Sequence, residues 1–399
     1  MKKTNKNKAD NKPSIEAFLK NVDFAVSQIE NNDFTMYFFV VDSKNVPNDM
    51  MAYIYQMAKS LHDKDYKVCM IYQMEGEYTQ SEIEAIEKGG GTPDENRVFV
   101  GVGDWLGQEY AELPHMNIMK EENQWTVGAY DFLFIPEVFS SFMFLTFKNK
   151  IPCKRYVILQ DYNYIMEFIP TGHQWANYGI DHVITTCEEQ AKRINDVFPY
   201  TKPYTTIIPP YFPACFRKPI TAKKMVVNII AKNKDDVNRI VKPFYWKYPL
   251  YNFISFRDLR GYPRQKYAEL LQEGQITVWC DEKTPFGVSA VEALKCGNLV
   301  IGKIPDIIPE WLTDDNGLWF NDINDVPELL FKAVSTLLAD DMPEILQNGI
   351  DAAEKLYPCD EYDKKLADFV EGMKKERVDE LRRFAEIEKN NVAKMEENK

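Results

Sequence analysis

Apolar residues follow two patterns along this chain, and the two patterns alternate. Short continuous runs predict buried strands, whereas apolar residues at helical spacing predict amphipathic helices. We expect strands at 34–41, 66–72, 98–102, 131–136, 156–159, 226–230, 251–256, 276–280 and 299–302. We expect helices at 15–29, 46–61, 81–88, 264–271, 326–338 and 345–370, with a charged helix over 374–399. Strands that alternate with helices in this way indicate an α/β protein with parallel sheets.

The stretch 276–302 is the most informative part of the chain. It predicts a strand, a loop, a helix and a second strand, which together form a βαβ unit. Thr284 and Pro285 are typical of a helix start, and Gly297 is typical of a helix end. The start of such a helix lies at the carboxyl edge of the sheet, where backbone N–H groups can hold a phosphate. Glu292 places a carboxylate inside this otherwise apolar helix.

Length and composition favour a two-domain globular protein. The chain has 399 residues, of which 45% are hydrophobic and 13% aromatic. A net charge of −13 argues against a nucleic-acid groove. The seven cysteines are scattered without paired spacing, which favours reduced thiols and a cytoplasmic location. We expect no transmembrane segment, because no apolar run approaches the length of a membrane-spanning helix.

Motifs in the same stretch resemble the signature of family-4-like glycosyltransferases (glycosyl transferases group 1) of the GT-B fold. The matching residues are at 286–287, 292–294, 296–297 and 300–302. That family carries two glutamates eight positions apart, the second contacting the nucleotide ribose and the first the donor sugar. Glu292 matches the second glutamate, whereas Thr284 stands at the position of the first. The resemblance therefore implies a nucleotide contact for Glu292.

The resemblance extends over about 34–369 and implies a GT-B architecture. We expect two Rossmann-like domains that face each other across a cleft, followed by a C-terminal helical extension. The predicted segments are an N-terminal arm and leading helix (1–33), an acceptor domain (34–219), a nucleotide-sugar donor domain (220–340), crossover helices (341–372) and a charged helical tail (373–399). Four prolines between 209 and 219 mark the link between the two domains.

Fixed cations are expected near the start of the second domain, because two donor phosphates in a cleft need neutralisation. The family places an arginine and then a lysine after the strand at 226–230. Here Lys232 stands near the first position, and Lys234 or Arg239 could replace the second. A charged loop and helix start explains the same residues equally well. The resemblance also implies that N–H groups near Phe286, Gly287 and Val288 meet the diphosphate.

Asp161 and Thr284 are the candidate catalytic residues. Where the family has a histidine that contacts the donor sugar, this chain reads Gln160-Asp161. Asp161 follows a strand end, where a carboxylate suits catalysis or acceptor orientation, but it could equally cap a helix. His173 is not at the family position, and a lone histidine is typical of a structural role. Without a D-x-D pair we expect no metal and no cofactor beyond the nucleotide-sugar substrate.

Both ends of the chain leave alternatives open. Five lysines within residues 1–13 indicate either a solvated tail or a weak contact with an anionic membrane, which would place a lipid-linked acceptor nearby. In the C-terminal tail, Val378, Leu381 and Phe384 form a narrow apolar stripe. That stripe could dock on a partner protein, or the helix could be solvated.

Two functions remain open on this sequence. The first is a glycosyltransferase that moves a hexose from a nucleotide-diphosphate sugar to an acceptor hydroxyl on a glycan, a lipid-linked molecule or another acceptor. The second is a catalytically inactive GT-B module with a binding or structural role in a larger assembly, such as a virion or a scaffold. Four departures from the family motivate the second hypothesis: Thr284 in place of the first glutamate, Gln160-Asp161 in place of the histidine, phosphate-binding cations out of register, and no glycine in the loop after the first strand.

Overall fold

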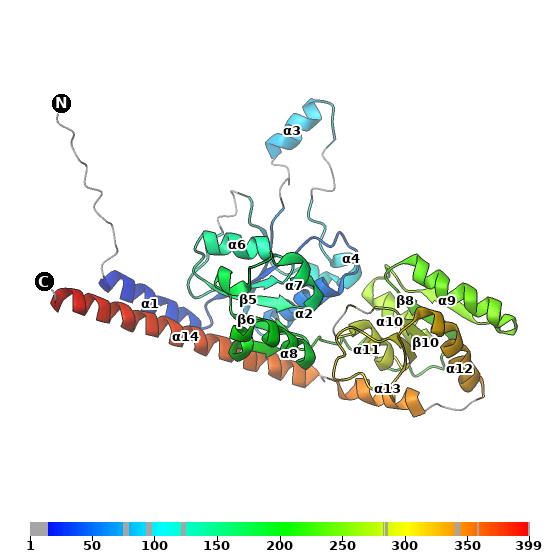
Figure 1. Cartoon of the computed structure of the whole chain (residues 1–399). Helices are drawn as coiled ribbons and strands as arrows, with labels where there is room; N and C mark the ends of the chain where they lie inside the picture. Colours follow the sequence, from blue (N-terminus) through cyan, green and yellow to red (C-terminus); the bar gives the residue numbers. More distant parts are fainter. Residues whose placement is uncertain are drawn as a thin grey trace.

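A computed structural model describes residues 15–74, 80–92, 98–120, 125–281, 283, 286–339, 344–356 and 359–397 (Figure 1). The first half of the chain builds a seven-stranded parallel sheet in the order β3-β2-β1-β4-β5-β6-β7. Its strands are β1 Thr35–Phe39, β2 Lys67–Tyr72, β3 His115–Asn117, β4 Phe132–Pro136, β5 Lys154–Leu159, β6 His182–Thr185 and β7 Thr205–Ile207.

Both faces of this sheet are covered by helices, as a parallel sheet requires. Side chains of β1 alternate between the two sides: Met36 and Phe38 face one apolar layer, and Tyr37 and Phe39 face the other. The helices of this half are α1 Ile15–Glu30, α2 Asp49–His62, α3 Gln80–Lys88, α4 Gly103–Leu106, α5 Gln108–Ala111, α6 Ser140–Lys148, α7 Tyr162–Phe168 and α8 Glu188–Val197.

The second half builds a five-stranded parallel sheet in the order β12-β11-β10-β8-β9. Its strands are β8 Lys224–Ile230, β9 Ser255–Asp258, β10 Gly274–Trp279, β11 Leu299–Lys303 and β12 Leu318–Phe320. Its helices are α9 Lys234–Lys247, α10 Arg264–Glu273, α11 Val288–Lys295, α12 Val326–Leu338 and α13 Glu344–Lys355. The prediction of an α/β protein with two parallel sheets is therefore confirmed.

One predicted strand is wrong, and another is displaced along the chain. Residues 98–102 form a loop, in which the Phe99 ring stacks on Tyr72 with centroids 4.1 Å apart. The Asp42 carboxylate accepts the N–H groups of Val100 and Gly101, so a side chain takes the place of a neighbouring strand. The predicted strand at 251–256 begins only at Ser255, because a 3₁₀ turn occupies Pro249–Tyr251.

The C-terminal segment is one long helix, α14 Cys359–Glu397, that runs beside α1 (Figure 1). The predicted boundary at 372–373 falls inside it. Its first turns pack into the core of the first sheet through residues such as Tyr362 and Leu366. Farther along, Val378 and Leu381 pack against Val22 of α1 and its apolar neighbours. The chain itself therefore covers most of the apolar stripe that was a candidate partner surface.

A buried histidine fastens α14 to the first sheet. One ring nitrogen of His182 lies 2.5 Å from Asp181 Oδ1, and the other lies 2.7 and 2.8 Å from the two carboxylate oxygens of Glu376 on α14. Lys154 also faces this group, 3.6 Å from Asp181 and 3.5 Å from Glu380. Burial lowers the pKa of His182, but hydrogen bonds to Asp181 and Glu376 outweigh burial and hold the pKa above its ordinary value.

We expect the free energy of unfolding to fall as the pH rises through the pKa of folded His182. Between the unfolded and the folded pKa, His182 is protonated only in the folded chain. Its stabilisation is therefore complete below the unfolded pKa and is lost above the folded pKa. His182→Gln should flatten this slope and cost about 1–2 kcal/mol at pH 6, because two half-exposed carboxylates lose a charged donor that is itself buried. Urea unfolding between pH 6 and 9 measures both effects, and an unchanged slope in His182→Gln would contradict the assignment.

Candidate functional site

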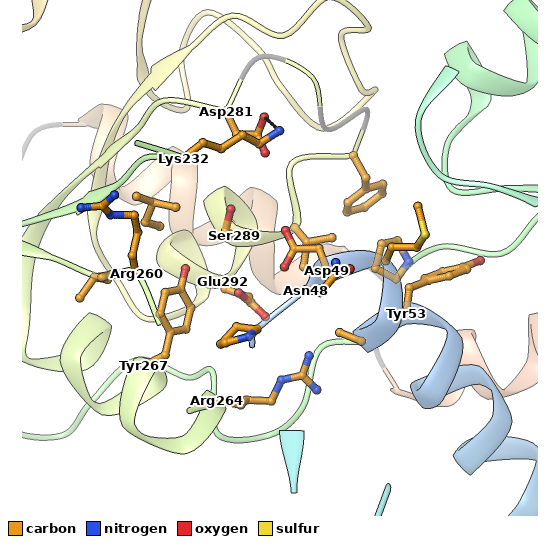
Figure 2. Close-up of a pocket in the computed structure, with 18 of the residues that line it drawn as sticks. Asn48, Asp49, Tyr53, Lys232, Arg260, Arg264, Tyr267, Asp281, Ser289 and Glu292 are labelled. Atoms are coloured by element: carbon orange, nitrogen blue, oxygen red, sulfur yellow. Dashed lines mark ion pairs between the residues drawn. The ribbon is translucent and has the colours of Figure 1, made fainter. Parts of the chain in front are cut away.

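A cavity of about 540 Å³ lies between the carboxyl edges of the two sheets (Figure 2). From the first half it is lined by the loop before α2, the first turns of α2 and the turn between β5 and α7. From the second half it is lined by the loops after β8, β9 and β10 and by the first turns of α11. Ligands of parallel α/β sheets bind at such carboxyl edges.

The start of α11 is shaped by a glycine held between two tryptophans. Gly287 is the N-cap, with a left-handed φ of 70° that suits glycine. A Cβ atom at this position would lie 3.1 Å from both Trp279 and Trp311. Trp311 Nε1 also donates to the Phe286 carbonyl at 2.6 Å. Phe286 and Gly287 are therefore held in place by the two tryptophans.

The predicted helix start at Thr284-Pro285 is wrong, because α11 begins three residues after Pro285, at Val288. Thr284 and Pro285 both lie outside the described residues, so the structure does not place this candidate catalytic residue. Phe286 and Val288 do line the cavity. Gly287 positions them from the adjacent N-cap without lining the cavity itself.

Glu292 lies in the second turn of α11 and lines the cavity with only 6% of its surface exposed. Its carboxyl group lies among Asp49, Tyr267 and Arg264 (Figure 2), and it interacts electrostatically with all three. Burial raises its pKa to about 8; Arg264 opposes this rise and Asp49 adds to it. A buried carboxyl group with a raised pKa in a cavity is a good candidate for a ligand contact.

Of the three predicted phosphate-binding cations, the structure brings only Lys232 to the cavity. Lys232 Nζ lies 3.0 Å from Asp281 Oδ1. Desolvation lowers the pKa of Lys232, but Asp281 outweighs it and raises the pKa. Lys234 is the first residue of α9, and its charge helps to lower the pKa of Asp258. The charge of Arg239 helps to lower the pKa of Asp322. Neither Lys234 nor Arg239 lines the cavity.

Two arginines in the cavity were missed by the sequence reasoning. Arg260 and Arg264 flank the turn 261–263 between β9 and α10. Arg260 pairs with Asp258, with Nε 3.0 Å from Oδ1 and 2.9 Å from Oδ2. Arg264 crosses to the first half of the chain. When the Gln56 amide presents its oxygen, Arg264 donates to it at 2.7 and 3.1 Å. The sequence feature that could have indicated the two arginines is the R-G-Y-P-R turn at 260–264, which follows a strand.

Asp161 both caps a helix and lines the cavity. Its carboxylate accepts the Asn163 N–H at 2.9 Å at the start of α7, so the capping alternative is confirmed. Glu137 follows β4 and is fully buried. Its carboxylate accepts the N–H groups of Gln160 and Asp161 at 3.1 and 2.8 Å. Burial raises the pKa of Glu137 to about 8. Glu137 therefore fixes the turn that presents Asp161, a role that its sequence position did not reveal.

Two further features limit other interpretations of the described residues. His173 lies 3.1 Å from the Tyr178 hydroxyl and does not line the cavity, so it has a structural contact. In the described part of the chain, histidine, cysteine and acidic residues form no group of three or more that could hold a metal ion. No helix in these described ranges is long and apolar enough to span a membrane.

Comparisons with known proteins identify the architecture. No family model matches this sequence, and no curated protein does either. Among solved structures, HepE from Anabaena in complex with UDP-glucose has a TM-score of 0.57 at 12% identity, covering 85% of this chain and 99% of that one. The pneumococcal O-GlcNAc transferase GtfA, with UDP and GlcNAc, has a TM-score of 0.57 at 10% identity, covering 87% and 99%. Sucrose-phosphate synthase from Thermosynechococcus elongatus has a TM-score of 0.54 at 12% identity, covering 85% and 99%.

Proposed function

This chain has the GT-B fold, and from that premise we propose that it is a glycosyltransferase that moves a hexose from a nucleotide-diphosphate sugar to an acceptor hydroxyl. HepE and GtfA are seen with UDP or a UDP-sugar, and their fold covers most of this chain. The single observation that carries the proposal is Glu292, a buried carboxyl group that lines the cavity between the two sheets.

On this proposal, the second half of the chain holds the donor. Glu292 accepts hydrogen bonds from ribose hydroxyls, which are strong when the acceptor is ionised. The backbone N–H groups at the start of α11 face the diphosphate, where the partial positive charge of a helix N-terminus favours an anion. Lys232 and Arg260 neutralise the charge that develops on the leaving nucleotide diphosphate. No step requires a metal ion.

The first half of the chain supplies the acceptor side of the same cavity. Asp161 and Gln160 reach it from the turn after β5, and Asn48 reaches it from the start of α2. Burial raises the pKa of Asp161, with Asp281 adding a smaller effect in the same direction. A carboxyl group at this place can accept a hydrogen bond from the acceptor hydroxyl and orient it.

Thermal unfolding with a panel of nucleotide diphosphates and nucleotide sugars tests the proposal. A ligand that binds only the folded chain stabilises it by about 2.7 kcal/mol at 100 times its Kd. We expect one nucleotide to raise the melting temperature clearly, and its base then selects the donors for a transfer assay. If no nucleotide at millimolar concentration shifts the melting temperature, the proposed donor site is wrong.

A second candidate is a GT-B module that binds a partner without turnover. One observation favours it: two cations of the cavity already have carboxylate partners within the chain, Lys232 with Asp281 and Arg260 with Asp258. A diphosphate would have to compete with both. The two functions differ in the transfer assay, because an inactive module releases no nucleotide diphosphate from a bound donor in the presence of acceptors.

A further inference from the structure

The charges that line the cavity are divided between the two halves of the chain. All three cations, Lys232, Arg260 and Arg264, come from the second half. The first half contributes two carboxyl groups, Asp49 and Asp161, and none of its described lining residues is a lysine or an arginine. Figure 2 shows Asp49 on α2 and the three cations on segments of the second half. The side of the cavity that belongs to the first half is therefore acidic.

The three cations are already balanced by carboxyl groups of the chain. Lys232 and Arg260 each pair with an aspartate of the second half, with nitrogen and oxygen 2.9–3.0 Å apart. Burial raises the pKa of Asp49 and of Glu292, and the charge of Arg264 opposes both rises. On the proposed function, Lys232 and Arg260 must also neutralise the donor diphosphate. A phosphate on the acceptor would find no further cation on the described lining.

The first half presents four polar side chains to the cavity, which we call the acceptor wall: Asn48, Asp49, Gln160 and Asp161. Asn48 accepts the Met51 N–H at 3.1 Å with its oxygen, so its two amide N–H groups remain to donate. Gln160 donates to the Met50 carbonyl at 3.2 Å, so its oxygen remains to accept. The bond to Met50 also holds Gln160 against the start of α2. The wall therefore offers both donors and acceptors to a ligand.

A half-buried aromatic ring lies beside the acceptor wall. Tyr164, in the first turn of α7, lines the cavity. Its ring meets Phe168 edge-on, with centroids 5.7 Å apart, which favours one orientation of the ring. Burial raises the pKa of Tyr164, and the charge of Asp161 adds to this rise, so the two side chains are close.

This combination of groups matches the chemistry of a sugar ring. Each sugar hydroxyl both donates and accepts a hydrogen bond, so it can use the carboxylates and the amides of the acceptor wall together. The C–H groups of the ring form an apolar face that can pack on an aromatic side chain. Binding sites of small molecules combine apolar surface with a few placed polar groups in the same way.

We propose that the acceptor wall binds an uncharged sugar unit and disfavours a unit that carries a phosphate. This inference rests on the proposed transferase function and narrows its acceptor class. Sugar hydroxyls donate to Asp161 and Asp49 and accept from Asn48, and the C–H face of the ring packs on Tyr164. A phosphate on the same unit would lie beside two aspartates without a cation, and like charges at close range weaken binding.

Ligand NMR without nucleotide tests the acceptor wall. The probes are the methyl glycosides of glucose, galactose, mannose and N-acetylglucosamine, each compared with its 6-phosphate. The titrations are made at pH 8, where a phosphate monoester carries its full charge. We expect at least one uncharged glycoside to bind the native chain. Its 6-phosphate should bind about tenfold more weakly or worse, because its charge is repelled by the wall.

Asp161→Asn tests the charge of the wall, because asparagine keeps an oxygen that can cap α7 and so retains the fold. Glu167→Gln is the matched control: it removes a charge from an exposed position of the same helix, and Glu167 does not line the cavity. We expect Asp161→Asn to weaken the uncharged glycoside about tenfold, because a charge-assisted hydrogen bond is lost. It should weaken the 6-phosphate less, because a repulsion is lost as well. Glu167→Gln should keep the native ratio of the two affinities.

Three results would overturn this inference. They are that no uncharged glycoside binds the native chain at high millimolar concentration, that a 6-phosphate binds as tightly as its parent glycoside, or that Asp161→Asn keeps the native ratio. The melting response of the native chain to nucleotide diphosphates is measured separately. A nucleotide response without glycoside binding would remove the inference and leave the transferase. Glycoside binding that depends on Asp161, without any nucleotide response, would refute the transferase and leave the sugar site.

Discussion

Glu292→Ala should weaken nucleotide binding about 100-fold or more while the chain stays folded. Above pH 8, where Glu292 is ionised, each charge-assisted hydrogen bond from a ribose hydroxyl contributes about 1.5–3 kcal/mol, and two such bonds account for this loss. The substitution also removes a carboxyl group whose burial is unfavourable when it is ionised. Calorimetric titration of the nucleotide that shifts the melting temperature measures the affinity. Native affinity in Glu292→Ala would remove Glu292 from the donor site.

Glu292→Ala should also change how the free energy of unfolding depends on pH. The pKa of folded Glu292 is raised to about 8, so the folded chain keeps a proton that the unfolded chain releases near pH 4.5. The native chain therefore loses stability as the pH rises between these values, by about 5 kcal/mol in all. Glu292→Ala lacks this loss, and its stability relative to the native chain should increase from pH 5 to pH 8.

Glu137→Gln provides the matched control. Burial raises the pKa of Glu137 to about 8 as well, but Glu137 does not line the cavity. The glutamine keeps an oxygen that can accept the N–H groups of Gln160 and Asp161. We expect this variant to show the same flattened pH dependence while it binds the nucleotide normally. A loss of binding in both variants would mean that the Glu292 effect is indirect.

Gly287→Ala should destabilise the chain by about 2–5 kcal/mol and weaken the nucleotide response. The left-handed φ of 70° costs a side chain about 1–2 kcal/mol. The added Cβ atom, 3.1 Å from both Trp279 and Trp311, costs about 1–3 kcal/mol more, because both rings are buried in the second half of the chain. Urea unfolding gives the free energy of unfolding.

Gly172→Ala separates the two costs. Gly172 has a φ of 82°, but no atom lies within 4 Å of the position that its Cβ would take. This variant should therefore show the backbone cost alone and leave the nucleotide response unchanged. Equal destabilisation by Gly172→Ala and Gly287→Ala would show that Trp279 and Trp311 move aside without a free-energy cost. The packing of Gly287 between them would then not determine the shape of the site.

Local patterns predicted the parts of the fold that depend on neighbouring residues. The helix that carries Glu292 and its two flanking strands were predicted because apolar spacing and terminal glycines act over a few residues. Lys232 was indicated by the resemblance to the glycosyltransferase family, and it lines the cavity two positions after β8. The short strand β3 was missed because His115–Asn117 is too short and too polar to show an apolar run.

Such local patterns could not predict contacts between distant parts of the chain. Arg264 meets Gln56 from the other sheet, and His182 meets Glu376 on α14. Neither partner stands near the other in the sequence, so no spacing indicates the pair. The helix start at Thr284-Pro285 was misjudged for a related reason: Trp279 and Trp311 enclose Gly287, and this packing places the N-cap there.

The path of the chain between its two halves has a mechanical consequence. The backbone crosses once between β7 and β8 and once between α13 and α14. The second crossing ends in helix turns that are part of the core of the first sheet, through Tyr362 and Leu366. Two crossings permit one half to rotate relative to the other more readily than to slide along it. The contact between Arg264 and Gln56 spans the two halves, so separating the halves at this place has to break it.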